Sequence, residues 1–260
     1  LANTCFFTSR AVTPSSLCMW WLTFLSGAVA LTPSSPLLAR RQPPRSSVVM
    51  ANWDPVRFVQ TTAFFNSPTD LLKRALPLPP QAVRDGLVWS AARPGALEWG
   101  PLDDVVMGGV SQSTFATTGG AATFSGTIST ENNGGFAGCR TKALKPALDL
   151  SSYRGLKLRV RGDGKRYKLI LRDDYAWNGI AWASSFDTTA GADEWQELDL
   201  TFDSFVPTLF ARSVPGKTLD TRAINTLQLT LSKFEYDNAL NPAFSDGPFR
   251  LELESVRAWS

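Results

Sequence analysis

Histidine is absent from all 260 residues of the sequence. This absence excludes acid/base catalysis by imidazole, serine–histidine–aspartate triads and every zinc site that requires an imidazole ligand. Cysteine is nearly as scarce, because Cys5 and Cys18 lie near the N-terminus and only Cys139 follows them. The chain after residue 50 can therefore form no internal disulfide, which suits a reducing compartment.

Acidic side chains are missing before Asp54, and the same stretch contains four arginines. The net charge of +3 is concentrated there, because residues 51–260 hold 22 basic and 23 acidic side chains, a net charge of −1. Overall charge therefore does not favour nucleic acid as a partner.

The N-terminal segment has the composition of a targeting leader. Residues 17–30 form an uncharged apolar run that ends in Ala28-Val29-Ala30, a small-x-small cleavage pattern. The run is shorter than the roughly 20 residues that a transmembrane helix needs. A stretch rich in serine, proline and arginine follows, up to residue 50. We predict a bipartite leader over residues 1–50 that directs the chain to a plastid; a mitochondrial leader, secretion and an uncleaved anchor are the alternatives.

Residues 51–80 contain two helix starts and then a proline-rich linker. Asp54-Pro55 and Ser67-Pro68 each combine a capping side chain with proline at the first helical position. The first helix places Phe58, Thr61, Thr62 and Phe65 on one face, and the second gathers Leu71, Leu72, Ala75 and Leu76. We favour packing of these helices on their own domain over contact of residues 53–76 with a partner or a membrane surface.

From residue 87 onward apolar and polar residues alternate, the pattern of strands buried on one face. The alternation is clearest in "GLKLRVRGDGKRYKLILRDD", residues 155–174, and returns in "TLQLTLS" (226–232) and "PFRLELESV" (248–256). Asp163-Gly164 fits the centre of a tight turn. We therefore predict a β-hairpin in which Val160 faces Tyr167, Leu158 faces Leu169 and Leu156 faces Leu171.

The outer face of this hairpin is expected to be basic, with Lys157, Arg159, Arg161, Arg166, Lys168 and Arg172. Like charges on paired strands repel each other, so acidic residues should lie nearby. The segment "WQELDLTFDSF" (195–205) supplies them in Glu197 and Asp199. We favour charge pairing between neighbouring strands over binding of an acidic partner or of RNA phosphates, for which Arg159 and Lys168 are the candidate contacts.

Turn-rich segments such as "ATTGGAA", "ENNGGFAG" and "NPAFSDGP" separate these short strands. Many short strands with regular turns indicate an antiparallel β-sandwich of the jelly-roll type. The predicted organisation is a leader (1–50), a helical segment with its linker (51–80) and an all-β domain (81–260).

Asp103 and Asp104, in "GPLDDVVMGGVSQSTF", are the first candidates for chemistry. They could act as an acid/base pair, or hold a cation together with Glu131. Adjacent residues on a strand point to opposite faces, however, so a structural role is favoured, in which one carboxylate caps the Gly108-Gly109 turn.

Three further groups have structural interpretations beside functional ones. One group is the run Asn132, Asn133, Gly134 and Gly135, whose residue types readily adopt left-handed backbone conformations. We favour a turn for this run over a ligand-binding loop. Cys139 lacks a base partner, which favours a half-buried thiol. Trp177 and Trp182 could stack on a sugar, although packing is the more frequent role of such rings.

Taken together the motifs resemble the complex I intermediate-associated protein 30 family. The resemblance rests on five collinear segments within residues 87–259: "DDVVMGGVSQSTF", "FSGTISTENNGGFAGCRT", "DLSSYRGLKLRVRGDGKRYKLILRDD", "WQELDLTFDSFVPTLFAR" and "GPFRLELESVRAW". The first family motif corresponds to Asp103, Asp104, Met107, Gly108, Gly109, Val110 and Ser111, and the second to Glu131, Asn132, Asn133, Gly134, Gly135 and Phe136.

The resemblance implies a galactose-binding-like jelly roll without established catalytic residues, so no catalytic residue, cofactor or metal ligand is carried over. The mitochondrial representative of the family assists assembly of respiratory complex I, and plastid relatives are associated with photosystem biogenesis. The chain is therefore expected to be a non-enzymatic accessory factor. It would bind protein subunits of a photosynthetic or respiratory membrane complex through its loops. A carbohydrate-binding module and an RNA-binding plastid factor are the alternatives.

Overall fold

The computed structural model describes residues 54–66, 78–93, 95, 97–176, 179–191 and 193–260. The predicted leader, the second predicted helix and Trp177 lie outside these residues. Helix α1 (Pro55–Phe65) precedes the strands, and the described chain also has three short 3-10 helices: η1 (Asp104–Met107), η2 (Glu131–Asn133) and η3 (Phe202–Ser204). No helix among the described residues has the length and hydropathy needed to cross a bilayer.

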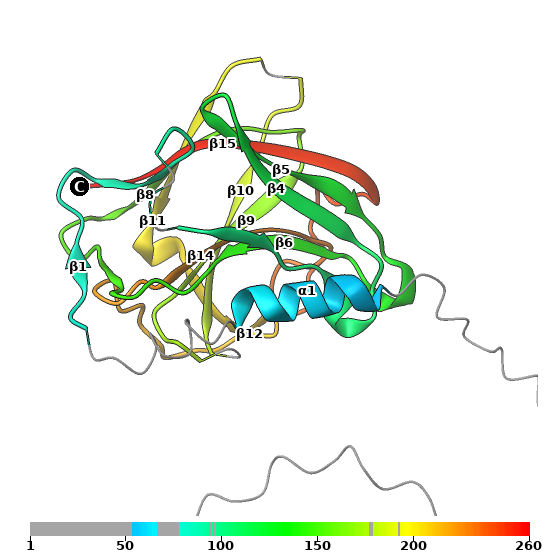
Figure 1. Ribbon diagram of the computed structural model, residues 1–260, viewed down its shortest axis with the longest axis horizontal. Helices are drawn as coiled ribbons and strands as arrows, with labels where there is room; N and C mark the ends of the chain where they lie inside the picture. The colour runs from blue at the N-terminus through cyan, green and yellow to red at the C-terminus, as the bar shows by residue number, and fades with distance from the viewer. Residues whose placement is uncertain (1–53, 67–77, 94, 96, 177–178, 192) are drawn as a thin grey trace, which may run out of the picture. The chain divides into compact units, whose positions relative to one another are not determined.

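The first large sheet has six strands (Figure 1). Their order is β11 (Gln196–Thr201), β8 (Gly155–Arg161), β15 (Gly247–Trp259), β5 (Ala121–Ile128) and β4 (Gln112–Thr118), with β2 (Leu87–Ser90) paired to β15. All of these pairings are antiparallel.

The second large sheet has seven strands, in the order β13 (Arg212–Ser213), β12 (Val206–Leu209), β10 (Ala181–Asp187), β9 (Arg166–Arg172), β14 (Thr226–Ser232), β6 (Phe136–Thr141) and β3 (Trp99–Pro101). These pairings are also antiparallel. A separate parallel pair consists of β1 (Gln81–Ala82) and β7 (Leu148–Asp149).

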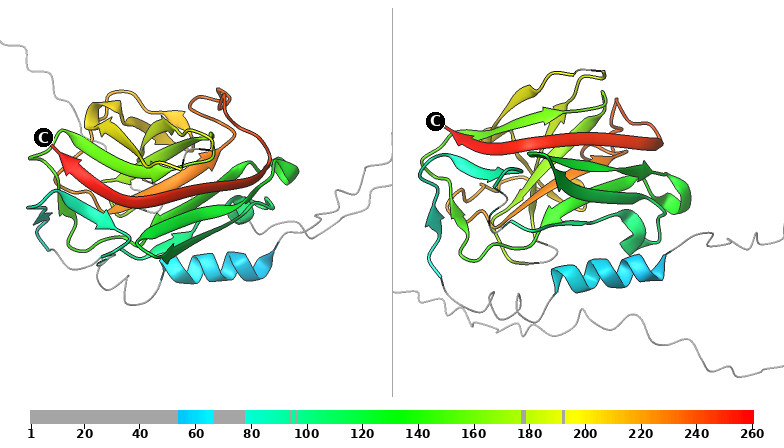
Figure 2. Two further views of the ribbon diagram at one scale, coloured as in Figure 1. Left: turned by 90° about the horizontal axis from the view of Figure 1, so that it is seen from above. Right: turned by 45° about the horizontal axis from the view of Figure 1, so that its top comes forward.

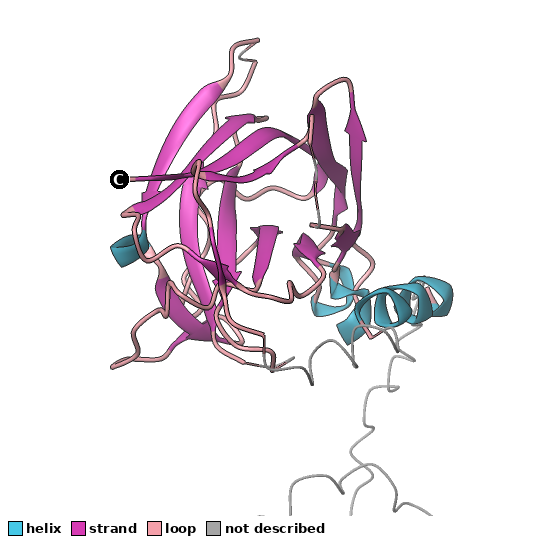
Figure 3. Cartoon of the chain, turned by 60° about the vertical axis from the view of Figure 1, so that its left-hand side comes forward, coloured by secondary structure: helices cyan, strands magenta, loops and turns pink. Residues whose placement is uncertain are grey.

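The core lies between the inner faces of the two large sheets (Figure 3). Phe124 of β5 and Tyr167 of β9 meet across it, with ring centroids 6.4 Å apart. The predicted inward positions are fully buried in β14 and almost so in β15: Leu227, Leu229, Leu231, Phe249, Leu251 and Leu253. The predicted antiparallel sandwich with a short N-terminal helix is therefore confirmed, because apolar side chains from the inner faces of both sheets form a common core.

The predicted hairpin is wrong, although both of its strands exist. Strand β8 pairs with β11 and β15 in one sheet, whereas β9 pairs with β10 and β14 in the other. Tertiary bonds hold the intervening turn: Asp163 accepts hydrogen bonds from the backbone N–H of Arg250 (2.8 Å) and from the hydroxyl of Tyr167 (3.0 Å). The leucines of the two strands thus contribute to the core from opposite layers.

Helix α1 begins where the sequence predicts it. The Asp54 side chain accepts hydrogen bonds from the backbone N–H groups of Val56 (2.9 Å) and Arg57 (3.1 Å), and Pro55 occupies the first turn. The buried side chains of the helix include Thr61 and Phe65. The helix lies beside the β6–β3 edge of the seven-stranded sheet (Figures 1 and 2), so the favoured packing of this segment on its own domain is correct for the first helix.

Candidate functional site

Two adjacent carboxylates are buried at the start of η1. Asp103 is 1% exposed and Asp104 is fully buried. The tight turn after them closes through backbone bonds, because Gly108 and Gly109 donate to the carbonyl oxygens of Val105 (3.2 Å) and Asp104 (3.0 Å). The predicted carboxylate cap of this turn is therefore wrong.

Asp104 instead joins the two family motifs. Its carboxylate accepts hydrogen bonds from the N–H (3.0 Å) and hydroxyl (2.7 Å) of Ser111 in the first motif. It also accepts from the N–H groups of Gly135 (2.9 Å) and Phe136 (3.3 Å) in the second motif. One buried side chain thus holds together two loops that lie about thirty residues apart in the chain.

Asp103 binds a second set of donors. It accepts hydrogen bonds from the N–H (2.9 Å) and hydroxyl (2.5 Å) of Ser113 and from the N–H of Gly138 (3.3 Å). Arg57 of α1 adds an ion pair of 3.0 Å and also donates to the carbonyl oxygen of Ser113. Burial raises the pKa of Asp103, and the bonds from Ser113, Arg57 and Gly138 oppose that rise. Asp103 therefore fastens α1 to the domain.

Glycine is required where the chain passes closest to Asp104. A Cβ on Gly109 would lie 2.3 Å from the Asp104 carboxyl carbon, and a Cβ on Gly134 would lie 2.5 Å from one of its oxygens. Neighbouring residues Asn132, Asn133 and Gly135 adopt positive φ angles of 52°, 61° and 110°, as their composition predicted. These residues therefore shape the loops around the carboxylate.

This arrangement favours the structural interpretation of the aspartate pair. Each carboxylate already accepts several hydrogen bonds from protein donors, while Glu131, the candidate third cation ligand, is exposed. Among the described residues, no group of three or more histidine, cysteine, aspartate or glutamate side chains is placed to hold a metal ion.

The same loops expose apolar side chains next to α1. Val106 and Met107 of η1 are 40% and 73% exposed, and α1, which contacts η1, presents Val56 and Val59 at 61% and 62%. Phe58 is 36% exposed. We call these five residues the α1–η1 surface. Large apolar side chains exposed together on a rigid framework are typical of protein or membrane contacts.

Sequence reasoning missed Arg57, Ser113 and Gly138 as parts of the site. Ser111 and Ser113 are two residues apart, so in an extended chain their side chains point to the same face. This spacing could have indicated that the two serines donate hydrogen bonds to the adjacent carboxylates. Arg57 lies 46 residues before Asp103, and no local pattern connects the two.

The expected charge pairing of the basic strand is confirmed. Glu197 lies opposite Arg159 and Asp199 lies opposite Lys157, with ion-pair distances of 3.8 Å and 3.6 Å. Arg159 also contacts Glu254 at 2.7 Å. The acidic strand predicted to balance β8 is therefore its direct neighbour, β11.

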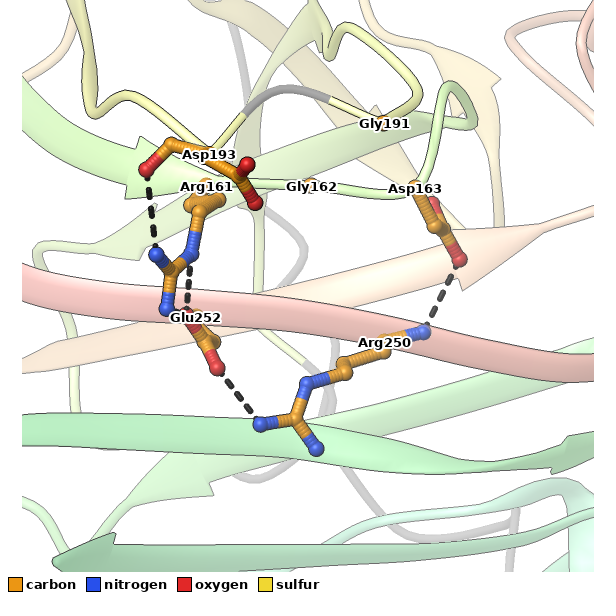
Figure 4. Close-up of a pocket in the computed structure, with 7 residues that line it drawn as sticks. All are labelled: Arg161, Gly162, Asp163, Gly191, Asp193, Arg250 and Glu252. Carbon is orange, nitrogen blue, oxygen red and sulfur yellow. Dashed lines mark hydrogen bonds and ion pairs between the residues drawn. The ribbon is translucent and has the colours of Figure 1, made fainter.

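Beside the end of β8, Glu252 of β15 lies between Arg161 of β8 and Arg250 of β15 in a polar cavity of about 230 Å³ (Figure 4). It accepts hydrogen bonds from Arg161 (2.6 Å) and Arg250 (2.5 Å). Burial alone would raise the pKa of Glu252, but the bonds from these arginines outweigh it and keep the pKa below its ordinary value. The arginines of this cavity are thus bound to a protein carboxylate.

The candidate RNA contacts do not form one surface. Arg159 belongs to the six-stranded sheet and Lys168 to the seven-stranded sheet. Lys168 is only 6% exposed, and its ammonium donates hydrogen bonds to the carbonyl oxygens of Phe234 (2.5 Å) and Glu235 (2.8 Å). The prediction that these two side chains could serve one nucleic-acid site is wrong, because it depended on the hairpin.

Burial lowers the pKa of Lys168 to about 8 from its ordinary value of 10.5. At pH values between these two pKa values, Lys168 is protonated more often in the unfolded chain than in the folded one. The free energy of unfolding should therefore rise with pH over this range. Relative to Lys168→Met, the wild type should gain about 1–2 kcal/mol of unfolding free energy between about pH 7 and about pH 9.5. Urea unfolding at both pH values measures this. A difference that stays constant over the interval would show that Lys168 titrates at its ordinary value.

Of the two tryptophans considered for sugar stacking, the structure describes only Trp182. Trp182 is 3% exposed and belongs to the core, so its ring offers no stacking face, and the packing interpretation is correct. Trp177 lies outside the described residues. Cys139 is fully buried rather than half-buried, and burial raises the pKa of its thiol well above the ordinary value.

The solved structures that this chain resembles at low identity include two carbohydrate-binding modules and an agarase. The family 11 carbohydrate-binding module of a cellulosomal cellulase of Clostridium thermocellum is 16% identical, with a TM-score of 0.49 over 69% of this chain and 96% of the module. The module from Clostridium thermocellum in complex with a β-1,3-1,4-mixed-linked tetrasaccharide gives 18% identity, a TM-score of 0.44 and coverage of 71% and 98%. An agarase is 9% identical, with a TM-score of 0.44 over 67% of this chain and 24% of the agarase chain.

At these identities no ligand can be transferred to this chain, and no curated protein sequence matches it. A protein-family model does match this chain. The model of complex I intermediate-associated protein 30 matches residues 90–253, which include both aspartate-linked motifs and nearly all of the described strands. The chain therefore belongs to the complex I intermediate-associated protein 30 family.

Proposed function

We propose that this chain is a non-catalytic accessory factor that binds subunits or assembly intermediates of a membrane electron-transfer complex. Family membership supports an assembly role of the complex I type. The observation that carries the proposal is the α1–η1 surface, because the residues typical of the family support an exposed apolar surface rather than a reactive group.

The chemistry of the site supports binding without catalysis. Asp103 and Asp104 accept hydrogen bonds from backbone and serine donors and stabilise the loops. This network rigidifies the backbone of η1, so a contact made by Met107 costs little backbone conformational entropy. The partner is accordingly a protein with a complementary apolar groove, and the exposed valines of α1 extend the contact.

The location of this activity is proposed from the N-terminal composition. An acid-free leader with an apolar run followed by a segment rich in serine, proline and arginine supports import into a plastid, with a photosynthetic complex as the client. A mitochondrial leader would make a respiratory complex the client. The exposed valines of α1 are also compatible with peripheral contact at the membrane that houses the complex.

The proposal is tested with a tagged chain expressed in its own organelle. Wild type should co-migrate with a subcomplex of an electron-transfer complex on native gels, with subunits identified by mass spectrometry. A double change of Val59→Asp and Met107→Asp should reduce the co-migrating fraction at least about tenfold, because it places two charges in an apolar contact.

The matched control is Phe210→Asp with Leu240→Asp, two side chains 78% and 71% exposed outside the α1–η1 surface. It adds the same charge and should leave co-migration unchanged. Migration of the wild type only as a free monomer, or equal loss in both double variants, would contradict the proposal.

A further inference from the structure

A cavity of about 640 Å³ opens between strand β1 and the chain that follows β2, away from the α1–η1 surface. Strand β1 lies at one side of the domain (Figure 1). Its described lining comes from residues 81–85, from residues 144–146 with Leu148, and from Leu87, Val88, Trp89, Arg93, Gly95 and Leu97. Its volume falls within the roughly 300–1,000 Å³ of small-molecule sites.

The inner wall of this cavity is apolar. Trp89 and Leu97 are 2% and 6% exposed, and both belong to the core. Val83, Leu144 and Leu148 pack against the core from the cavity walls. An occupant therefore needs a hydrocarbon or aromatic body to displace water from this wall favourably.

The charged lining of the cavity is mostly cationic. Among the described residues, Arg84, Arg93 and Lys145 line the cavity together with one acidic residue, Asp85, and the Lys145 ammonium also lies 4.3 Å from the ring centroid of Tyr175. The Asp85 carboxylate accepts a hydrogen bond from the N–H of Leu87 at 3.1 Å. Neither Arg84 nor Arg93 forms an ion pair within the described part of the chain, and both are exposed. This differs from the polar cavity of Figure 4, where Glu252 already binds the arginines.

We infer that this cavity binds an amphipathic organic anion, a molecule with an apolar body and one carboxylate or phosphate group. The apolar wall takes the body, and Arg84, Arg93 and Lys145 attract the charged group. The inference does not depend on the proposed assembly role, because the cavity shares no residue with the α1–η1 surface.

Calorimetric titration with decanoate tests the inference, and decanol serves as the uncharged probe of similar length. Decanoate should bind one site at least about tenfold more tightly than decanol. The double change Arg84→Gln and Arg93→Gln should weaken decanoate about tenfold, whereas Arg212→Gln with Lys217→Gln, which removes equal charge elsewhere, should change affinity less than about twofold.

A second variant pair tests the cavity itself. Ala82 lines the cavity and is exposed, so Ala82→Trp should fill the space and abolish binding while leaving thermal unfolding unchanged. Ala116→Trp adds the same ring to an exposed position on β4 and should bind decanoate like the wild type. No decanoate binding, equal binding of decanol, or binding unaffected by Ala82→Trp would each overturn the inference.

Discussion

Replacing Asp104 with alanine should lower the free energy of unfolding by about 3–5 kcal/mol. The change removes the acceptor for donors on Ser111, Gly135 and Phe136 in a fully buried position. Buried donors left without a partner each cost about 1–3 kcal/mol, and water cannot replace the carboxylate unless the loops open. Urea denaturation followed by circular dichroism measures the loss.

Asp203→Ala is the matched control, because Asp203 is exposed on η3. Its unfolding free energy should stay within about 0.5 kcal/mol of the wild type. Asp104→Asn, which keeps the shape and one acceptor oxygen, should lie between wild type and alanine. If Asp104→Ala were as stable as Asp203→Ala, the carboxylate would not hold the two motifs together.

Replacing Gly134 with alanine should destabilise the domain by about 2–3 kcal/mol. The new Cβ would lie 2.5 Å from an Asp104 oxygen and 2.7 Å from the carbonyl oxygen of Ser129. Both atoms belong to the network that joins the loops, so neither can move without breaking hydrogen bonds. Thermal and urea unfolding of the variant measure this effect.

Gly119→Ala separates this steric effect from backbone strain. Gly119 has a φ of +62° and no atom within 4 Å of an added Cβ, so its substitution carries conformational strain alone. We expect about 1 kcal/mol for Gly119→Ala. An equal or smaller cost at Gly134 would show that the Asp104 network yields easily, and would contradict its role as the rigid support of η1.

Several features of this protein follow from local sequence. The start of α1 is encoded by Asp54-Pro55, because a cap needs only the side chain and the first turn of the helix. The inward faces of β14 and β15 are encoded by period-two alternation. Family membership follows from the motifs of residues 90–253. These signals lie within single segments and do not require knowledge of a spatial neighbour.

The pairing of strands was decided only by the tertiary structure. Alternation specifies which face of β8 and β9 is buried, but it is equally satisfied by a hairpin in one sheet and by strands in opposing sheets. The structure has the second arrangement, and the Asp163 carboxylate at the intervening turn accepts a hydrogen bond from the backbone N–H of Arg250, 87 residues later. The predicted basic face does not form, because β8 and β9 lie in different sheets. The predicted ion pairs between β8 and β11 are present.

The role of the aspartate pair also depended on the three-dimensional structure. The sequence by itself determined that histidine chemistry is absent and that Asp103 and Asp104 precede a glycine turn. Only the fold decided that both carboxylates are buried and that their donors come from loops and a helix remote in the chain. The physical reason is that burial and hydrogen bonding depend on atoms brought together by packing, whereas a sequence pattern describes only the neighbours along the chain.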